Sequence, residues 1–453
     1  MDRVWTVQPQ AETFLQGWLA DALARVPEAA RYAEALKIGT GVRLRDIIDH
    51  LTGDDALVAA AKTAGWRAEA GAHENRDGFF PGIIRSTGET RIGFRVESVD
   101  RFLAATGISA DVAGPAFGPL RMATVFRGDG IAFVAVERNG ATGYTIEPVS
   151  EASIRATRLH LQVFRTRRRR FDTVEQGLVH TEALVDAAVA SIGQHRACDI
   201  WLRAERDYWM TRCPAGARQK ARQDAHGIGW SNIDHHTYDG SRQHFAGTVH
   251  ILEKLGYELR EMLYAGALAG WGSQILEQPA LRSTIFADVD LAPHEIAIDF
   301  AHDVLPPLDK HRRAGIISVM HGESILEGGL NHVAGMYDNV AMRAVQAQGG
   351  QAMMAPFSDF TFLYQELTEG DWAAVEPSRL DVLEAGGHLT PAEAEDFRLN
   401  GAIAAHLENL ERNDGFKGFN MPGIDGVLRT IDPRRNIVEA PAKDGKNMVE
   451  AAE

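Results

Sequence analysis

One short segment of this chain occurs twice, and the repeat limits the folds that the rest can adopt. Residues 48–52 read Ile-Asp-His-Leu-Thr, and residues 233–237 read Ile-Asp-His-His-Thr. Each copy is followed by a helical pattern, then by a glycine next to an aromatic residue, and then by a polar, strand-like run. The same order of elements in two places indicates a duplicated unit. We therefore expect an α+β fold with duplicated βαβββ modules and a histidine on the first strand of each.

The rest of the chain is assigned around these two copies. Residues 90–100 are echoed by residues 281–290, which we interpret as corresponding strands of the two modules. The segment between the copies has helical periodicity and is expected to be an insertion. The predicted organisation is a first module with N-terminal helices at 1–150, a helical insertion at 151–228, a second module at 229–330, and a C-terminal α+β extension at 331–453.

Local patterns predict several individual elements. Asp54 follows the first copy and is placed to begin a helix. Residues 331–350 have a helical pattern, whereas residues 314–323 resemble a strand. A further helix is expected to begin at Pro391, with Thr390 as its N-cap, and to run to about residue 410.

Composition restricts the possible partners. The chain has 453 residues, of which 45% are hydrophobic and 24% charged, as is usual for a globular protein. Its net charge of −15 disfavours nucleic acid or an anionic membrane as a general partner. Neither a signal peptide nor an apolar run long enough to cross a membrane is expected. Two cysteines, Cys198 and Cys213, are predicted to be free thiols in a cytoplasmic protein.

A basic run at residues 165–170 (Arg-Thr-Arg-Arg-Arg-Arg) has two interpretations. It could bind an anion or nucleic acid, or it could be a solvated helix face beside acidic neighbours. Because the chain as a whole is acidic, the solvated face is the preferred interpretation.

Two of the 17 histidines stand out, because His50 and His235 occupy the same place in the repeat. Modules related by a pseudo-two-fold axis would bring both to one centre, where they could bind a metal. The alternative is that duplication kept a structural histidine in both copies.

The third ligand should be a carboxylate on a late strand of the second module. Residues 314–323 end in Glu323, which is the predicted ligand, with Glu327 and His321 as local competitors. Two histidines and one carboxylate would leave three adjacent coordination positions open, as in non-haem Fe(II) oxygenases. The same donors also suit Mn, Co or Ni, so the ligand set does not fix the metal.

These features resemble the vicinal-oxygen-chelate superfamily and, within it, the 2-oxoadipate dioxygenase/decarboxylase family, also called 2-hydroxyglutarate synthases. The similarity covers about residues 45–415 and depends on the shared order of short pieces. These pieces are His50 before a helix, residues 233–237, residues 281–286, Gly322 with Glu323, residues 357–363 and residues 395–397. The resemblance implies a vicinal-oxygen-chelate-type metal barrel with helical insertions, in which His50, His235 and Glu323 bind Fe(II).

The resemblance also implies a reaction. The family uses O₂ in the oxidative decarboxylation and hydroxylation of a 2-oxo acid, so a small organic acid and O₂ are the expected partners. The family has an arginine four residues after the first histidine, where this chain has Asp54. An aspartate there would repel a carboxylate and attract a cation. Arg282 and Arg95 are then the candidates to hold the substrate carboxylate, unless they are merely exposed arginines on strands.

Two other functions are consistent with the sequence. A metal-dependent lyase or isomerase could use the same scaffold, with Glu323 or a neighbour moving a proton. Alternatively, the duplicated histidines could be structural, in a binding protein without catalytic activity.

Overall fold

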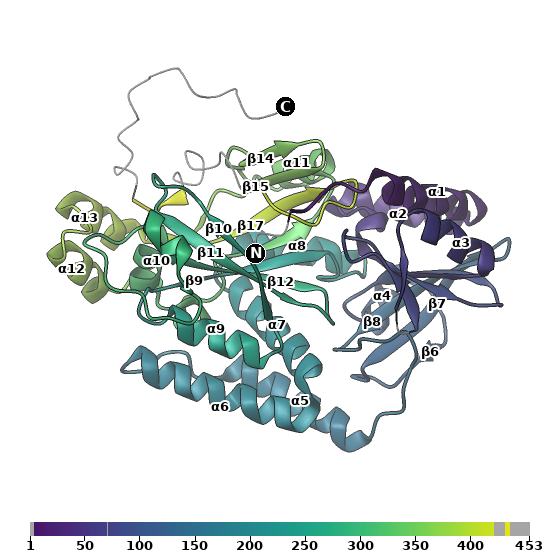
Figure 1. The fold of residues 1–453 in the computed structure, drawn as a ribbon, viewed down its shortest axis with the longest axis horizontal. Helices are drawn as coiled ribbons and strands as arrows, with labels where there is room; N and C mark the ends of the chain where they lie inside the picture. The colour runs from purple at the N-terminus through teal and green to yellow at the C-terminus, as the bar shows by residue number, and fades with distance from the viewer. Residues whose placement is uncertain (1–3, 70, 421–430, 435–453) are drawn as a thin grey trace.

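The computed structural model describes residues 4–69, 71–420 and 431–434, which form two large mixed sheets and a layer of helices (Figure 1). The strands of the first sheet are β1 (Ile48–Gly53), β2 (Arg67–Glu69), β3 (Ala72–Glu74), β4 (Gly82–Arg85), β5 (Thr90–Arg95), β6 (Val112–Ala113), β7 (Leu120–Gly128) and β8 (Ile131–Arg138). They lie in the order β2-β3-β4-β1-β5-β8-β7-β6.

The second sheet has the same arrangement. Its strands are β9 (Ile233–Gly240), β10 (Glu258–Tyr264), β11 (Trp271–Gln278), β12 (Ser283–Asp290), β13 (His332–Met336), β14 (Ser358–Phe360), β15 (Leu363–Leu367), β16 (Asp371–Ala373) and β17 (Ala402–Arg412). The order is β10-β11-β12-β9-β13-β17-β15-β14, and β16 pairs with β17 outside this path. The two sheets therefore share one topology.

The helices lie between and around these strands. They are α1 (Pro9–Arg25), α2 (Pro27–Thr40), α3 (Asp55–Thr63), α4 (Val99–Thr106), α5 (Glu151–Thr166), α6 (Val174–Ile192), α7 (Gln194–Met210), α8 (Pro214–Ala225), α9 (Phe245–Lys254), α10 (Arg313–His321), α11 (Asn339–Gln348), α12 (Pro377–Ala385) and α13 (Pro391–Asn400). Short helical turns are η1 (Leu44–Ile47), η2 (Pro293–Ala297) and η3 (Ser324–Gly328).

Each sheet is built from two βαβββ units placed side by side. In the first sheet, β1-α3-β2-β3-β4 is followed by β5-α4-β6-β7-β8, and the antiparallel first strands β1 and β5 meet at the centre. In the second sheet, β9 and β13 meet in the same way, with β17 as the last strand of the second unit. The predicted α+β fold, with duplicated βαβββ modules and helical insertions, is confirmed. The described residues contain the unit four times.

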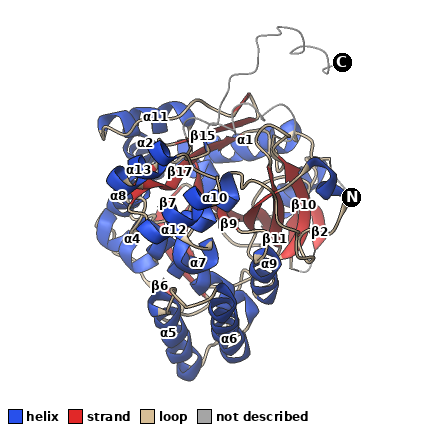
Figure 2. Cartoon of the chain, turned by 90° about the vertical axis from the view of Figure 1, so that its left-hand side faces the viewer, coloured by secondary structure: helices blue, strands red, loops and turns tan. Residues whose placement is uncertain are grey.

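The insertion between the sheets is helical, as its periodicity predicts, and consists of α5 to α8. Figures 1 and 2 show α5 and α6 as a layer along one side of the molecule, with α7 rising from it toward the sheets. Helix α7 is buried over much of its length, including the large side chains Trp201 and Trp209. It therefore connects the outer layer to the core. Within the described residues, every helix is too short or too polar to cross a bilayer.

Two predicted helix starts are confirmed because their caps form. The Asp54 side chain accepts hydrogen bonds from the amides of Ala56 and Leu57, at 3.0 and 3.1 Å, and begins α3. Thr390 and Glu393 form a reciprocal capping box at the start of α13. Both predicted free thiols are unpaired, and both are buried.

Three sequence predictions about local structure are wrong. Residues 314–321 lie in helix α10 instead of a strand, and the helix ends before Gly322, whose φ is +89°. Residues 331–350 begin with strand β13 before α11. Helix α13 ends at Asn400 instead of near residue 410, because Gly401 has a φ of +76° and β17 follows.

Two sequence interpretations also change. Residues 281–290 contain β12, whose position in the sheet order matches that of β4, so they are not the counterpart of β5 in residues 90–100. The basic run is only partly solvated. Arg167 is fully buried and forms an ion pair with Glu205 at 2.8 Å, which Arg169 also contacts at 2.6 Å.

Candidate metal centre

Three side chains with metal-binding atoms converge on the second sheet. They are His235 on β9, His332 on β13 and Glu408 on β17, and their ligand atoms all lie within 4.8 Å of one another. Nε2 of His235 is 3.2 Å from Oε2 of Glu408, and Nε2 of His332 is 3.1 Å from the same oxygen. His235 and Glu408 are almost fully buried. Two imidazole nitrogens and one carboxylate oxygen thus face a common point, which is a donor set that suits a divalent transition metal.

Strand register brings these residues together. Alternate residues of a strand point to the same face, so His235 and Thr237 share one face of β9. His332 lies opposite Thr237, and Ala334, two residues further on, lies opposite both His235 and Glu408. The three ligand positions therefore occupy one face of three adjacent strands. Thr237 Oγ1 lies 2.8 Å from His332 Nε2, which confirms that these side chains share that face.

Each ligand is held by a further polar contact. His235 Nδ1 lies 2.9 Å from Asp234 Oδ1, so Nε2 is the nitrogen that faces the cluster. Arg412 donates hydrogen bonds to both carboxylate oxygens of Asp234. Such contacts fix the ring orientation of a metal-binding histidine.

The other two ligands have contacts of the same kind. His332 Nδ1 lies 2.9 Å from Asn331 Oδ1. Gln365 donates to Glu408 Oε1 at 2.9 Å and leaves Oε2 facing the two histidines.

The electrostatics of the cluster favour a bound cation. Burial raises the pKa of Glu408, but the charge of His235 outweighs it and lowers that pKa to about 2. Burial lowers the pKa of His235, but the charge of Glu408 and the hydrogen bond with Asp234 outweigh it and raise that pKa to about 9. Burial lowers the pKa of His332. The protein alone therefore keeps a proton on His235, at a position that a metal ion would take.

The surroundings of the cluster are apolar. The ring of His235 packs against Phe286 at 4.6 Å and Phe419 at 5.4 Å between centroids, and these two phenylalanines contact each other at 4.5 Å. They belong to a buried cluster that also includes Met336 and Leu363. These side chains exclude water from the His235 side of the site.

A buried acidic pair lies on the same face of the second sheet. Asp239 is two residues beyond Thr237 on β9 and lies opposite Asp288 on β12. Arg313, at the start of α10, forms an ion pair with both. Burial raises the pKa of Asp239 to about 7, against the effect of Arg313, and burial also raises the pKa of Asp288. Asp239 can therefore hold or release a proton near neutral pH.

The structure brings one of the three predicted ligands, His235, into the cluster and leaves the other two outside. His50 lies on β1 in the first sheet, where its Nδ1 is 2.7 Å from Asp49 and its ring packs on Tyr144 at 5.2 Å between centroids. Glu323 lies between α10 and η3, where it accepts a hydrogen bond from the amide of Ser241 at 3.0 Å. It thereby stabilises the loop after β9.

The register of the first sheet shows why His50 has no such partners there. Thr52 lies opposite Arg91 on β5, whereas Thr237 lies opposite His332 on β13. The exposed Arg91 therefore stands where the second sheet has His332.

The first sheet also lacks a carboxylate at the position that corresponds to Glu408. Val134 on β8 lies opposite Gly93, and Glu408 lies opposite Ala334. Gly93 and Ala334 are equivalent, because each lies opposite the repeated histidine. An apolar valine thus stands at the position of Glu408. The first sheet repeats His235 as His50 but has neither of the other two donors.

The predicted substrate residues are not beside the cluster. Asp54 is exposed and serves as the N-cap of α3. Arg282 donates to the carbonyl oxygen of Phe80 at 2.8 Å and forms an ion pair with Glu74. Arg95 pairs with Asp49 at 3.1 Å. Both arginines line a separate cavity between the sheets.

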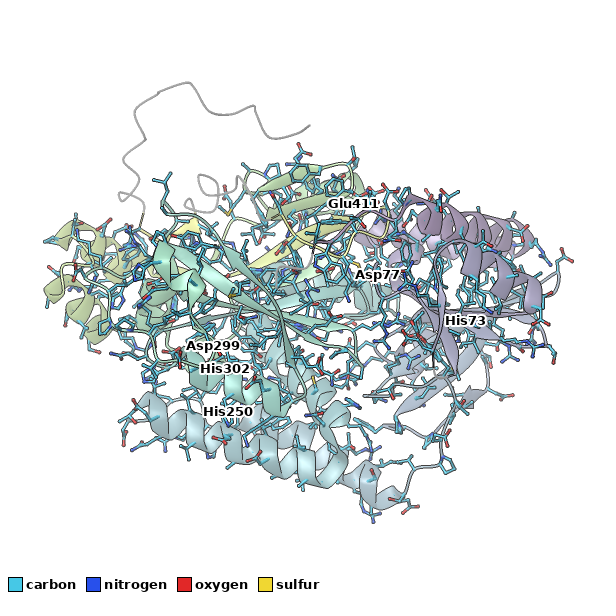
Figure 3. The ribbon with its side chains drawn as sticks, in the orientation of Figure 1. His73, Asp77, His250, Asp299, His302 and Glu411 are labelled. Carbon is cyan, nitrogen blue, oxygen red and sulfur yellow. The ribbon has the colours of Figure 1, made fainter. Side chains whose placement is uncertain are left out.

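The histidine–carboxylate contacts of His302 and His250 are peripheral (Figure 3). His302 lies 2.9 Å from Glu253 and 2.7 Å from Asp299, and all three are at least one-third exposed. His250, near them in Figure 3, lies 3.3 Å from Glu182 and is 56% exposed. They lack the burial that distinguishes the metal-centre cluster.

Sequence reasoning missed His332 and Glu408. One feature of the sequence could have indicated His332. It follows a polar residue and begins a βαβββ unit, in the same way that His50 and His235 follow a polar residue on the first strand of theirs. The helical pattern predicted for residues 331–350 hid this strand.

Comparison with known proteins gives structural similarities alone. No protein-family model matches the chain, and no curated protein does. A mutant 4-hydroxymandelate synthase from Streptomyces coelicolor is 12% identical, with a TM-score of 0.31, over 74% of this chain and 95% of that one. Methylmalonyl-CoA epimerase from Mycobacterium tuberculosis is 13% identical, with a TM-score of 0.22, over 40% of this chain and 88% of the epimerase chain.

A fusion of a xylose isomerase-like TIM barrel with 4-hydroxyphenylpyruvate dioxygenase is also similar. It is 11% identical, with a TM-score of 0.23, over 85% of this chain and 51% of the fusion protein. At these scores, function has to be argued from the residues of this chain.

Proposed function

We propose that the chain is a non-haem Fe(II) oxygenase that binds its metal through His235, His332 and Glu408 and acts on a small organic acid. The observation that supports this most directly is the convergence of two imidazole Nε2 atoms on one carboxylate oxygen, at 3.2 and 3.1 Å, in a buried site. Two histidines and one carboxylate are the ligand set of that enzyme class. Bound Fe(II) would supply adjacent open positions for an organic acid and for O₂.

The chain's own residues have separate roles in this proposal. Asp234 and Asn331 orient the two imidazoles, and Gln365 orients the carboxylate. Phe286 and Phe419 keep water away from the metal face beside His235.

The substrate class is a 2-oxo acid or a related amino or hydroxy acid, and oxidative decarboxylation with hydroxylation is the reaction. The support is the order of sequence features shared with the 2-oxoadipate dioxygenase/decarboxylase family. Asp54 is an exposed helix cap away from the cluster, so it gives no ground for choosing between 2-oxoadipate and other acids of this class.

The metal assignment is tested by four matched variants. His332→Ala and Glu408→Ala should lose bound Fe(II), because each removes one of three donors. His50→Ala and Glu323→Ala should keep bound Fe(II), although both residues are buried and were predicted from the sequence as ligands together with His235. Metal content after anaerobic Fe(II) loading is the measurement. Loss of iron in His50→Ala or Glu323→Ala with retention in Glu408→Ala would refute the assignment.

The reaction class is tested with an oxygen electrode. A panel of 2-oxo, amino and hydroxy acids is added to the Fe(II)-loaded protein, and O₂ uptake should accompany CO₂ release from at least one of them. Glu408→Ala should abolish the uptake. If no acid in the panel causes O₂ uptake above that variant, the oxygenase proposal fails.

A second candidate is a metal-dependent lyase or isomerase, which the properties of Asp239 favour. A carboxyl group with a pKa of about 7 on the metal-bearing face can act as a general acid or base. Turnover that continues without O₂ and falls in Asp239→Asn would support this candidate. Full activity of a protein without metal would contradict both.

A further inference from the structure

A second site lies between the two sheets, away from the candidate metal centre. A cavity of about 650 Å³, here called the intersheet cavity, is bounded by the first sheet, helix α7 and the start of β9. The three candidate metal ligands are not among its lining residues. Its volume lies within the range of about 300–1,000 Å³ that is common for small-molecule sites.

The charged side chains of this cavity show what it could bind through the way they pair, because their total charge is nearly balanced. Nine basic and eight acidic side chains line it, so its formal charge is close to balanced. Most pair with one another, such as Lys417 with Glu277 at 2.7 Å and Arg203 with Asp199 at 3.0 Å. Burial also raises the pKa of Asp199, which weakens its negative charge. Two arginines are left incompletely neutralised.

The first is Arg206 on α7. It is 91% buried, and no carboxylate of a described residue lies within ion-pair distance of it. Its guanidinium contacts Nε2 of His236 at 3.1 Å, and its Nε has no hydrogen-bond partner among the described residues. The carboxylates of Glu97 and Asp199 act on Arg206 only at longer range. A buried cation without a direct ion pair is costly, and a bound anion would lower that cost.

The second is Arg95 on β5. Its Nε donates to Asp49 Oδ1 at 3.1 Å, but Arg138 already donates to both oxygens of Asp49, at 2.6 and 2.7 Å. His50 also lies 2.7 Å from that carboxylate. One carboxylate thus serves two guanidinium groups. The terminal nitrogens of Arg95 make no hydrogen bond to another described residue and are available to the cavity.

The rest of the wall is suited to an organic group. Apolar side chains of helix α7 and of the segments that connect the strands line the cavity beside these arginines, among them Leu202, Phe79, Phe80, Trp230 and Leu281. An inorganic ion would leave this surface uncovered, whereas a ligand with an apolar body would bury it.

We propose that the intersheet cavity binds a small organic anion whose carboxylate or phosphate is held by Arg206 and Arg95. A guanidinium presents paired N–H donors that match either oxyanion. The site goes beyond the proposed oxygenase function and does not depend on it, because it contains no metal ligand. Its second wall includes Asp234, which contacts His235, so the two sites share one residue of the protein framework.

The test is isothermal titration of the full chain, after chelator treatment, with phenylacetate, phenyl phosphate and benzyl alcohol. The three probes share an aromatic ring and differ in the oxyanion. We expect saturable binding of at least one anion and none of the neutral alcohol. The anion that binds more tightly identifies the head group. Absence of binding of both anions at millimolar concentration would overturn the proposal.

Substitutions of the two arginines test whether the anion binds in the intersheet cavity. Arg206→Gln should weaken it about tenfold or more, as expected for loss of a charged hydrogen bond. Arg95→Gln provides a second test that does not alter a fully buried residue. Arg158→Gln, an exposed arginine on α5 outside the cavity, is the matched control and should bind normally. Unchanged binding in both Arg206→Gln and Arg95→Gln would contradict the proposal.

A last variant separates this site from the metal centre. His332→Ala should bind the anion as tightly as the unmodified chain, whatever the outcome of the metal assignment. Loss of anion binding in His332→Ala would mean that the probe occupies the metal centre, and the cavity proposal would be wrong.

Discussion

Arg412 donates hydrogen bonds of 2.6 and 3.1 Å to Asp234, although 178 residues separate the two in the chain. Asp234 in turn contacts His235 Nδ1 at 2.9 Å. The first sheet repeats this arrangement with Arg138, Asp49 and His50. The Arg–Asp–His trio therefore occurs in both sheets, whereas, among the described residues, the other two donors of the candidate metal centre occur in the second sheet alone.

This difference gives a prediction for Asp234. Asp234→Asn should weaken metal affinity by about 10–100-fold, because His235 loses the carboxylate that orients it and raises its basicity. Asp49→Asn, the same change in the first sheet, should leave metal affinity unchanged. Competition with a chromophoric chelator measures both. Equal losses in the two variants would show that the effect comes from general destabilisation.

Metal binding should release about one proton at pH 7. His235 has a pKa of about 9 in the protein alone, so it is protonated at pH 7, and an imidazole must be neutral to bind a metal. Glu408, with a pKa of about 2, has no proton to lose at that pH. Affinity should therefore rise with pH up to about 9. Calorimetry in buffers of different ionisation enthalpy counts the protons, and a count of zero at pH 7 would contradict the prediction.

Asp239 should make stability depend on pH. Burial raises its pKa from 3.8 to about 7, so the folded chain holds this proton over a pH range in which the unfolded chain has lost it. The resulting stabilisation is complete below about pH 4 and is lost as pH rises through about 7. Asp239→Asn should flatten the free energy of unfolding over this range. Urea unfolding at several pH values measures the slope, and Asp381→Asn, a change at an exposed residue, should not alter it.

Glu205 should be important for folding stability. It is buried between Arg167 and Arg169, so Glu205→Ala would leave two buried or largely buried cations without their carboxylate. Breaking a buried pair in this way costs about 3–5 kcal/mol. Asp207→Ala, two residues further on in α7, removes a partly exposed contact with Arg165 and should cost less than about 1 kcal/mol. Denaturant unfolding compares them, and equal costs would contradict the argument.

The sequence predicted the repeated unit and one residue of the candidate metal centre because both depend on local pattern. Residues 48–52 and 233–237 share a strand pattern that can be recognised from the sequence alone, and this pattern led to the prediction of His235. The βαβββ topology followed from the order of elements after each copy. The caps at Asp54 and Thr390 are likewise local, because each depends on side-chain hydrogen bonds within three residues.

The other two ligands depend on pairing between distant strands. Strand β13 contains Ala334 and Gly335, which are weak strand formers, and it is held by β9 on one side and β17 on the other. Strand β17 is rich in alanine, leucine and glutamate, which favour helices. Its pairing with β13, β15 and β16 overrides that propensity. Local propensity therefore disfavours both strands, and the register that assembles His332 and Glu408 could not be predicted from the sequence.

The position of β17 in the chain has a consequence for how the centre is made during synthesis. His235 and His332 are translated first, and Glu408 and Arg412, which brace and complete the site, come from one later strand. A nascent chain that has not reached residue 412 carries both imidazoles without the carboxylate or the arginine. On the proposed metal assignment, metal loading would be a late event in biogenesis, and metal content would show whether the final strand has docked.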